Sequence, residues 1–283
     1  FNPIGSISGV LLSKVFILSH LNLSSAADRA QMSSEELTAI QSEELTSVMG
    51  TYVGVAFVLI IIWVLVKFTK MPKASDEENK IDLLPSLKRL IKNPNYKWSV
   101  VAQFFYMGAQ IGVWSYTIRY VMQELSLNED DSSTYYLASL VLFSVSRFIF
   151  TGLMKFFTPR ILLLISALGG GICTLIVIYG SGISGVIALV CISGFMSLMF
   201  PTIYGLGMTR LGKDAKIGGS GLIMAILGGA VLTAVQGQIS DITQSINLSF
   251  YMPLFCFVVV AIYALYQRKL EKNRTPVIAR YEA

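Results

Sequence analysis

The sequence reads RILLLISALGGGICTLIVIYG over residues 160–180, a run of 21 residues in which the single charge, Arg160, stands first. An α-helix rises 1.5 Å per residue, so about 20 apolar residues cross the roughly 30 Å hydrocarbon core of a bilayer. We interpret this run as one membrane-spanning helix.

Similar runs occur on both sides of it. We predict seven further spans at 1–18, 50–68, 98–121, 135–157, 185–208, 217–239 and 247–266. Hydrophobic residues make up 54% of the chain and charged residues 14%, whereas soluble domains average about 45–50% and about 25%. The composition predicts an all-α, polytopic helical membrane protein and argues against a soluble enzyme.

The distribution of charge predicts the orientation. If the first span runs from inside to outside, the inside stretches hold 18 of the 22 Lys and Arg residues and the outside loops hold one. Basic residues concentrate on the cytoplasmic side of membrane proteins, so we expect a cytoplasmic carboxyl terminus in a bacterial cytoplasmic membrane. The net charge of +5 is thereby explained by contact with the bilayer, without a nucleic-acid partner.

Two long connections predict the domain organisation. Residues 19–49 read as an external loop, and residues 69–97 read as a cytoplasmic linker with a surface helix at Leu83–Ile91. Many transporters consist of two six-helix halves joined by such a linker. We therefore expect 1–68 to hold the last two helices of the first half, 98–266 to be the second half and 267–283 to be a tail. Two spans before the linker and six after it imply that four helices of a twelve-helix protein are missing, and the absence of a starting Met agrees with a chain cut at its amino terminus.

The segment 98–121 carries the clearest polar face. Gln103, Tyr106, Gln110, Trp114 and Thr117 fall within about 80° at 100° per residue. Amide and phenol groups pair with hydroxyls, and a flat aromatic ring stacks on a pyranose, so the face suits a sugar. The alternative is that the amides bond across helix interfaces while the aromatic rings fill gaps.

Further candidates lie in neighbouring spans. Arg147 and Arg119 are predicted either to gate or form ion pairs, or to extend toward the membrane surface. Phe200 and Tyr204 are spaced four residues apart and either border a cavity or pack. Pro201 removes a helical hydrogen bond and is expected to bend its helix.

Other kinds of site find little support. All 17 acids lie in loops or at span ends, and one histidine with three cysteines in apolar runs offers no metal-binding spacing. We therefore expect no metal site, no cofactor and no enzymatic activity. A non-transporting membrane sensor or assembly partner is the alternative from another class, but it would need a signalling domain that the sequence does not show.

Several motifs together resemble the fucose–galactose–glucose:proton symporter family of the major facilitator superfamily, over nearly the whole chain. They are AQIGVWSYTIRY at 109–120 for its seventh helix, Arg147-Phe148 with Gly152 and Pro159 for its eighth, MSLMFPTIYGLG at 196–207 for its tenth, KIGGS at 216–220 with Gly228-Gly229 for its eleventh, and Phe1-Asn2 for its fifth.

The resemblance implies sugar uptake by alternating access, driven by protons, in a monomeric carrier. It implies L-fucose first, with glucose, galactose or N-acetylglucosamine as alternatives. Asn2 matches a sugar-binding Asn of the family, and Phe200 stands where the fucose carrier has Tyr. Ala234 replaces a Pro of many members, which puts a bend of that helix in doubt. The proton-coupling Asp and Glu belong to the family's first and fourth helices, which we expect this chain to lack.

Overall fold

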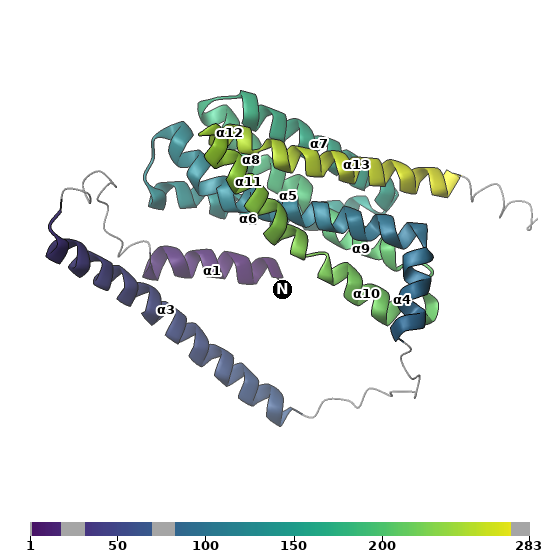
Figure 1. Cartoon of the computed structure of the whole chain (residues 1–283), viewed down its shortest axis with the longest axis horizontal. Helices are drawn as coiled ribbons and strands as arrows, with labels where there is room; N and C mark the ends of the chain where they lie inside the picture. Colours follow the sequence, from purple (N-terminus) through teal and green to yellow (C-terminus); the bar gives the residue numbers. More distant parts are fainter. Residues whose placement is uncertain (1, 18–31, 70–82, 273–283) are drawn as a thin grey trace, which may run out of the picture. The chain divides into compact units, whose positions relative to one another are not determined.

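The computed structural model describes residues 2–17, 32–69 and 83–272, and Figure 1 shows them as helices with short connections. No strand occurs among these residues. The predicted all-α class is therefore confirmed for this part of the chain.

Six helices in the described part are long and apolar enough to cross a membrane. They are Ser34–Phe68, Glu129–Leu153, Pro159–Tyr179, Gly182–Met208, Gly212–Thr243 and Ile246–Glu271. Two predicted spans are not among them. Helix α1 (Asn2–Phe16) has 15 residues, and α5 (Pro94–Leu125) carries the polar face, which lowers its mean hydropathy. The number of eight spans stays a prediction.

The chain forms two compact units, Phe1–Ile81 with Asn128–Ser133 and Asp82–Leu127 with Thr134–Ala283. Helices α1 and α3 (Ser34–Phe68) belong to the first. The start of α3 corrects the expected external loop at 19–49, because residues from 34 onward are helical. Ser33 Oγ accepts a hydrogen bond from Glu36 N at 3.3 Å, and Glu36 Oε2 accepts one from Ser33 N at 3.1 Å. This capping box starts the helix early. The rest of that loop, 19–31, lies outside the described residues.

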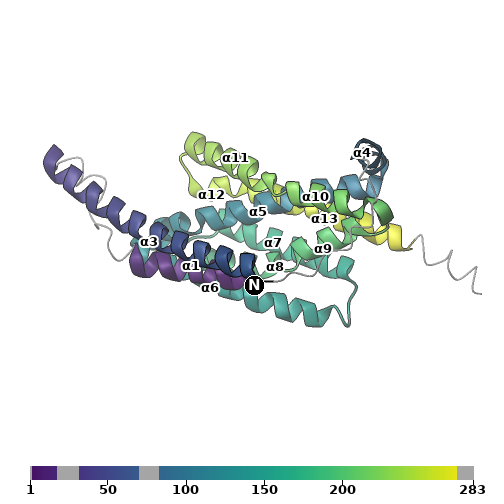
Figure 2. The ribbon, with the colours of Figure 1, turned by 90° about the horizontal axis from the view of Figure 1, so that it is seen from below.

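The second unit is a bundle in which α5 lies among α8, α9, α11 and α13 (Figure 2). Fifteen of the 32 residues of α5 are buried, which makes it the central helix. Besides α5, this unit contains α6 (Glu129–Leu153) from Thr134 onward. Its other helices are α4 (Leu83–Lys92), α7 (Pro159–Tyr179), α8 (Gly182–Met196), α9 (Met199–Met208), η2 (Gly212–Asp214), α10 (Ala215–Met224), α11 (Leu227–Thr243), α12 (Ile246–Ser249) and α13 (Tyr251–Lys272).

Two predicted spans are broken near their middles. The span 185–208 becomes α8 and α9, and the span 217–239 becomes α10 and α11. At the second break, Ile226, Gly228 and Gly229 donate to carbonyls three residues back, which tightens the chain into a 3₁₀ turn. A Cβ on Gly228 would overlap the carbonyl oxygen of Phe104, so glycine is required where α11 crosses α5. Ala234 lies within the unbroken α11, and the bend of this span comes earlier than the position of the family's proline.

Polar side chains form hydrogen bonds between helices at the end of the bundle where α5 begins. Ser99 Oγ lies 2.8 Å from Tyr263 Oη, and Gln267 Nε2 donates to Tyr263 Oη at 2.9 Å and to Asn95 Oδ1 at 2.6 Å. Asn95 Nδ2 donates to the carbonyl of Leu206 at 3.2 Å. These bonds join α5, α9 and α13 on the side predicted to be cytoplasmic.

Glu124 links the other end of α5 to α8 and α12 by hydrogen bonds. Its carboxylate accepts hydrogen bonds from Asn247 Nδ2 at 2.9 Å and from the backbone N–H of Gly182 at 2.7 Å. The end of α5, the start of α8 and the short α12 are thus tied together. With both ends of α5 fixed, its polar face has a defined position against α8 and α9.

Candidate functional site: a helix break lined by polar and aromatic side chains

The break between α8 and α9 lies at Ser197 and Leu198. Pro201 follows four residues after Ser197, so it supplies no N–H to the Ser197 carbonyl, and its ring crowds that carbonyl. Pro201 itself sits in the first turn of α9, where a missing N–H leaves no helical bond unmade. The predicted bend is thus present, and the proline places it at Ser197.

Arg147 of α6 supplies the hydrogen bond that Pro201 cannot. Its Nε donates to the carbonyl oxygen of Ser197 at 3.2 Å, and its guanidinium lies 5.1 Å from the ring centre of Phe143. The carboxyl end of α8 carries a partial negative charge, so the cation is placed where the helix dipole favours it. The partner seen for Arg147 is a backbone carbonyl rather than a carboxylate, and a role in gating stays a prediction.

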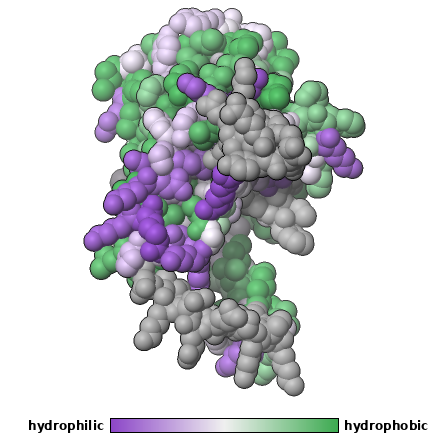
Figure 3. All heavy atoms as spheres, turned by 90° about the vertical axis from the view of Figure 1, so that its right-hand side faces the viewer, coloured by the Kyte–Doolittle hydropathy of each residue, from purple (hydrophilic) through white to green (hydrophobic). Residues whose placement is uncertain are grey.

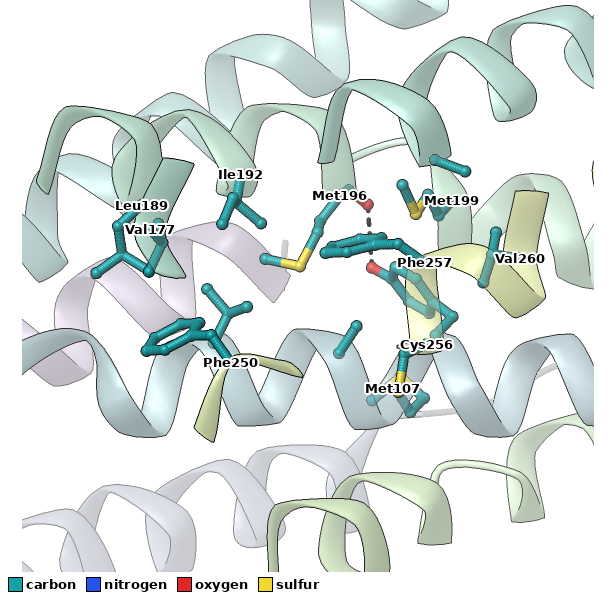
Figure 4. Close-up of a cluster of buried hydrophobic side chains, with 14 of the residues drawn as sticks. Met107, Val177, Leu189, Ile192, Met196, Met199, Phe250, Cys256, Phe257 and Val260 are labelled. Carbon is teal, nitrogen blue, oxygen red and sulfur yellow. Dashed lines mark hydrogen bonds between the residues drawn. The ribbon is translucent and has the colours of Figure 1, made fainter. Parts of the chain in front are cut away.

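Tyr106 of α5 bonds the same helix end. Its side chain has no exposed surface, and its hydroxyl donates to the carbonyl of Met196 at 3.0 Å, the dashed line in Figure 4. The ring of Tyr106 lies 6.3 Å from that of Phe200. Tyr106 therefore connects the polar face of α5 with both sides of the break.

Trp114 extends the cluster by two turns along α5. Its Nε1 donates to Ser193 Oγ of α8 at 3.2 Å, and its ring meets Phe143 of α6 edge-on at 5.2 Å. Phe143 thus lies between the indole of Trp114 and the guanidinium of Arg147. Three helices contribute side chains to one connected set of polar and aromatic contacts.

Phe200 and Tyr204 continue the set along α9. Both are half-buried, and their rings are nearly parallel, with centres 6.4 Å apart and an interplanar angle of 7°. Tyr204 also packs against a second apolar cluster that contains Tyr96 and Leu211. The aromatic rings of Tyr106, Phe200 and Tyr204 therefore form a row beside the break.

The two glutamines of the polar face have different environments. Gln110 lies one turn from both Tyr106 and Trp114, is 9% exposed and forms no hydrogen bond with the described residues. Gln103 has no exposed surface, and neither its Oε1 nor its Nε2 has a hydrogen-bond partner in the described part of the chain. Buried amides normally have partners, so the amide of Gln103 is an anomaly for which a ligand or water is the usual explanation.

Of the remaining predicted site residues, Arg119 lies apart from this set. Arg119 is exposed and lies 6.0 Å from the ring centre of Tyr116, near the end of α5 beyond Trp114. Asn2 is the first residue of α1, but its side chain lies outside the described part of the structure.

Sequence reasoning missed Ser193 and the carbonyls of Met196 and Ser197. A serine in an apolar run and a backbone carbonyl carry no sequence signal of their own. The only available signal was Pro201, because a proline leaves the carbonyl four residues before it without a helical donor.

The set combines hydrogen-bonding groups and aromatic rings with one cation, that of Arg147. The donors of Trp114 and Tyr106 are bonded within the set, whereas the amides of Gln103 and Gln110 form no hydrogen bond with the described residues. Amides bind hydroxyls, and aromatic rings pack on the apolar face of a sugar ring. Among the described residues, no group of three or more His, Cys, Asp or Glu side chains is placed to hold a metal ion.

Comparison with known families gives a match over most of the chain. A family model described as Major Facilitator Superfamily matches residues 1–234. The chain is 34% identical to an L-fucose-proton symporter of Haemophilus influenzae, over 96% of the chain and 66% of that protein. It is 34% identical to the L-fucose-proton symporter of Escherichia coli, over 96% of the chain and 64% of that protein. The chain thus spans slightly less than two thirds of the length of these relatives.

More distant relatives and solved structures agree. A putative glucose/galactose transporter of Helicobacter pylori is 27% identical over 96% of the chain and 65% of that protein. The crystal structure of a variant of the Escherichia coli fucose:proton symporter matches with a TM-score of 0.72 and 33% identity, over 93% of this chain and 66% of that one. A fucose transporter in the outward conformation matches with a TM-score of 0.73, 33% identity and coverage of 94% and 65%.

Proposed function

We propose that this chain, which belongs to the Major Facilitator Superfamily, acts in a proton-coupled sugar carrier whose substrate is L-fucose. The observation that carries the proposal is the 34% identity with L-fucose-proton symporters over 96% of the chain. That matching region contains the polar and aromatic set at the α8–α9 break. The chain is a transporter-family member rather than an enzyme.

The residues of the break have distinct roles in this proposal. Gln110 donates and accepts hydrogen bonds with sugar hydroxyls, because its amide forms none with the described residues. Trp114 and Phe200 present ring faces to the apolar side of the pyranose, and Tyr106 holds the end of α8 in place. Asn2 is proposed as a further sugar ligand from the family resemblance.

The proton-carrying group is proposed to lie outside the described residues. A carrier usually moves a proton on a carboxylate within the membrane. In the second unit, the described Asp and Glu side chains stand at or near helix ends, such as Glu124 in α5 and Asp241 in α11. Coupling therefore requires a group that these helices do not provide.

The chain is a multi-pass membrane protein by family and by its helices. We place it in the cytoplasmic membrane of a bacterium, as a monomer with a cytoplasmic carboxyl terminus. The excess of basic residues on one side supports this orientation.

Uptake of radiolabelled L-fucose tests the function. The protein, expressed from its complete gene in cells that lack their own carrier, is expected to accumulate fucose, and a protonophore should abolish accumulation. Unlabelled fucose should compete better than glucose, galactose or N-acetylglucosamine. If no sugar is taken up although the protein is in the membrane, the family likeness describes the fold alone and the proposal fails.

Gln110→Ala tests the site. Loss of a hydrogen-bonding group from a binding site costs about 1–3 kcal/mol, so uptake efficiency should fall by about 5-fold to 150-fold. Gln123→Ala is the matched control, because Gln123 is on the same helix but exposed, where it bonds Asn247. If both variants behave like the parent, Gln110 is not a sugar ligand.

A glucose/galactose carrier is the second candidate. It is favoured by the relative in Helicobacter pylori and by Phe200, which lacks the hydroxyl that the resemblance associates with fucose. Phe200→Tyr is then expected to shift competition toward fucose and away from the hexoses. Competition by hexoses in the parent that exceeds that of fucose would select this candidate.

A further inference from the structure

Helix α4 lies across the end of the bundle at which α5 begins. Figure 1 shows it nearly perpendicular to α5 and α13, and Figure 2 views it along its own axis while those two helices run across the picture. If the bundle helices cross a membrane, α4 runs parallel to the membrane plane. It begins with Leu83 and ends with Lys92, immediately before α5.

The rotation of α4 about its axis is fixed by contacts on one side. Leu90 is 2% exposed and packs in the apolar cluster with Leu211 and Leu222. Arg89 donates from Nη2 to Asp214 Oδ1 at 2.6 Å and from Nε to Asp214 Oδ2 at 2.9 Å. Ser86 Oγ accepts a further bond from Arg89 at 2.9 Å. Such a two-point pair holds its geometry well, so the side of α4 that carries Ser86 and Leu90 is fixed against the bundle.

The helix surface next to this buried side is apolar and uncovered by the described residues. Its members lie within an arc of about 100° around the helix. They are Leu83, Leu84, Leu87 and Ile91, with exposures of 66%, 72%, 47% and 56%. Lys88 and Lys92 occupy the next 80° of the same helix surface and are exposed. An apolar stripe with lysines along one margin is the pattern of a helix at a membrane surface.

The depth of α4 fits the lipid headgroup layer. Trp98 lies four residues after Pro94, or about 6 Å along α5, and it is 48% exposed. Its ring lies 6.3 Å from that of Tyr266 at the end of α13. Tyrosine and tryptophan gather at the boundary between lipid tails and headgroups. Figure 3 views this end and shows hydrophilic side chains gathered beside hydrophobic ones.

We propose that α4 is a lipid-binding helix that lies in the headgroup layer of the cytoplasmic leaflet. The stripe of Leu83, Leu84, Leu87 and Ile91 enters the acyl boundary. Lys88 and Lys92 bind the phosphates of anionic phospholipids. Positive charge beside an apolar stripe complements an anionic lipid surface, which favours lipid over an apolar protein partner as the occupant. Through Arg89 and Leu90 the bound lipid is connected to η2 and α10.

A fluorescent label at position 87 tests the insertion. The protein from its complete gene, with its three native cysteines replaced by alanine, receives Leu87→Cys, an environment-sensitive dye and nanodiscs of phosphatidylcholine with up to 30% phosphatidylglycerol. We expect blue-shifted emission that is quenched by lipids carrying a nitroxide near the glycerol. The matched control is Lys213→Cys, which places the dye on the exposed η2 at the same end. Emission at 87 like that at 213 overturns the proposal, and so does a blue shift without lipid quenching, which would mean a protein cover.

Retention of lipid tests the two lysines. Native mass spectrometry measures how many phosphatidylglycerol molecules stay bound relative to phosphatidylcholine. Lys88→Gln with Lys92→Gln should lower this preference, by about fivefold for each lysine. Lys213→Gln with Lys216→Gln removes the same charge at the same end, and we expect a change of less than about twofold. Equal losses in both pairs would show an effect of net charge alone and overturn the assignment to α4.

Discussion

The substitution Gln103→Met measures how much a buried amide without hydrogen-bond partners destabilises the protein. Gln103 is fully buried, and both polar atoms of its amide lack partners in the described residues. An unsatisfied buried polar group costs about 1–3 kcal/mol. Methionine has nearly the same helix propensity as glutamine, and it fills space well because its chain is flexible. The variant is therefore expected to raise the free energy of unfolding by about 1–3 kcal/mol.

The matched control is the same substitution at Gln267. That side chain is 3% exposed but bonds Asn95 and Tyr263. Gln267→Met leaves these partners unsatisfied and should lower the free energy of unfolding by about 1–3 kcal/mol. The assay is reversible unfolding in mixed micelles with sodium dodecyl sulfate, followed by circular dichroism. If Gln103→Met destabilises the protein as much as Gln267→Met does, Gln103 has a bonding partner and the reasoning is refuted.

Unfolding of the same variant in the presence of sugar tests whether Gln103 contacts the substrate. A ligand at 100 times its dissociation constant stabilises the folded state by about 2.7 kcal/mol. If the amide of Gln103 serves the sugar, fucose should stabilise the parent but stabilise Gln103→Met much less. Equal stabilisation of both proteins would mean that the amide does not touch the sugar.

The remaining predictions concern packing and the break. Gly228→Ala should lower the free energy of unfolding by about 1–3 kcal/mol, because the new Cβ would overlap the carbonyl oxygen of Phe104 in α5. Gly205→Ala, which has open space around its Cβ, should raise the free energy of unfolding by up to about 1 kcal/mol. Equal changes for the two variants in denaturant titrations would contradict the close crossing of α11 and α5. Arg147→Met should lower the free energy of unfolding by about 1.5–3 kcal/mol, whereas Arg119→Met should change it by less than about 0.5 kcal/mol. Tyr106→Phe should lower the free energy of unfolding by about 1 kcal/mol, because it loses the hydrogen bond to the end of α8. An unchanged unfolding midpoint would mean that this hydrogen bond does not stabilise the protein.

Six of the spans and the all-helical class could be predicted because length and hydropathy are local properties of the chain. The start of α3 could not be placed the same way. Its first turns are rich in Ser and Glu, which suit both a loop and a capped helix, and Ser33 with Glu36 decides between them only through their mutual hydrogen bonds. The same polar residues that make one face of α5 noticeable in the sequence also lower the mean hydropathy of that helix.

The side chains of the polar and aromatic set share a pattern that the sequence shows, but the groups to which they bond do not. Tyr106, Trp114 and Phe200 share a spacing that the sequence shows, whereas the carbonyl of Met196 has no sequence signature. Gln103 and Gln267 are both glutamines in apolar surroundings, and only the positions of neighbouring helices make one unpartnered and the other bonded twice. Such differences arise from packing between distant segments, which one sequence does not encode in any local pattern.

Arg147 shows how the break relates to transport. The sequence left two interpretations open, extension toward the membrane surface or a gating contact. Because Pro201 leaves the Ser197 carbonyl without a helical donor, Arg147 on another helix satisfies it. Any movement of α9 that carries Ser197 away from α6 must break this bond and leave a charge and a carbonyl in an apolar layer, at a cost of about 1–3 kcal/mol or more. A sugar seated against Phe200 can repay that cost only by gaining new hydrogen bonds in the moved state. In the proposed carrier, we therefore expect this contact to make movement of α9 depend on occupancy of the site.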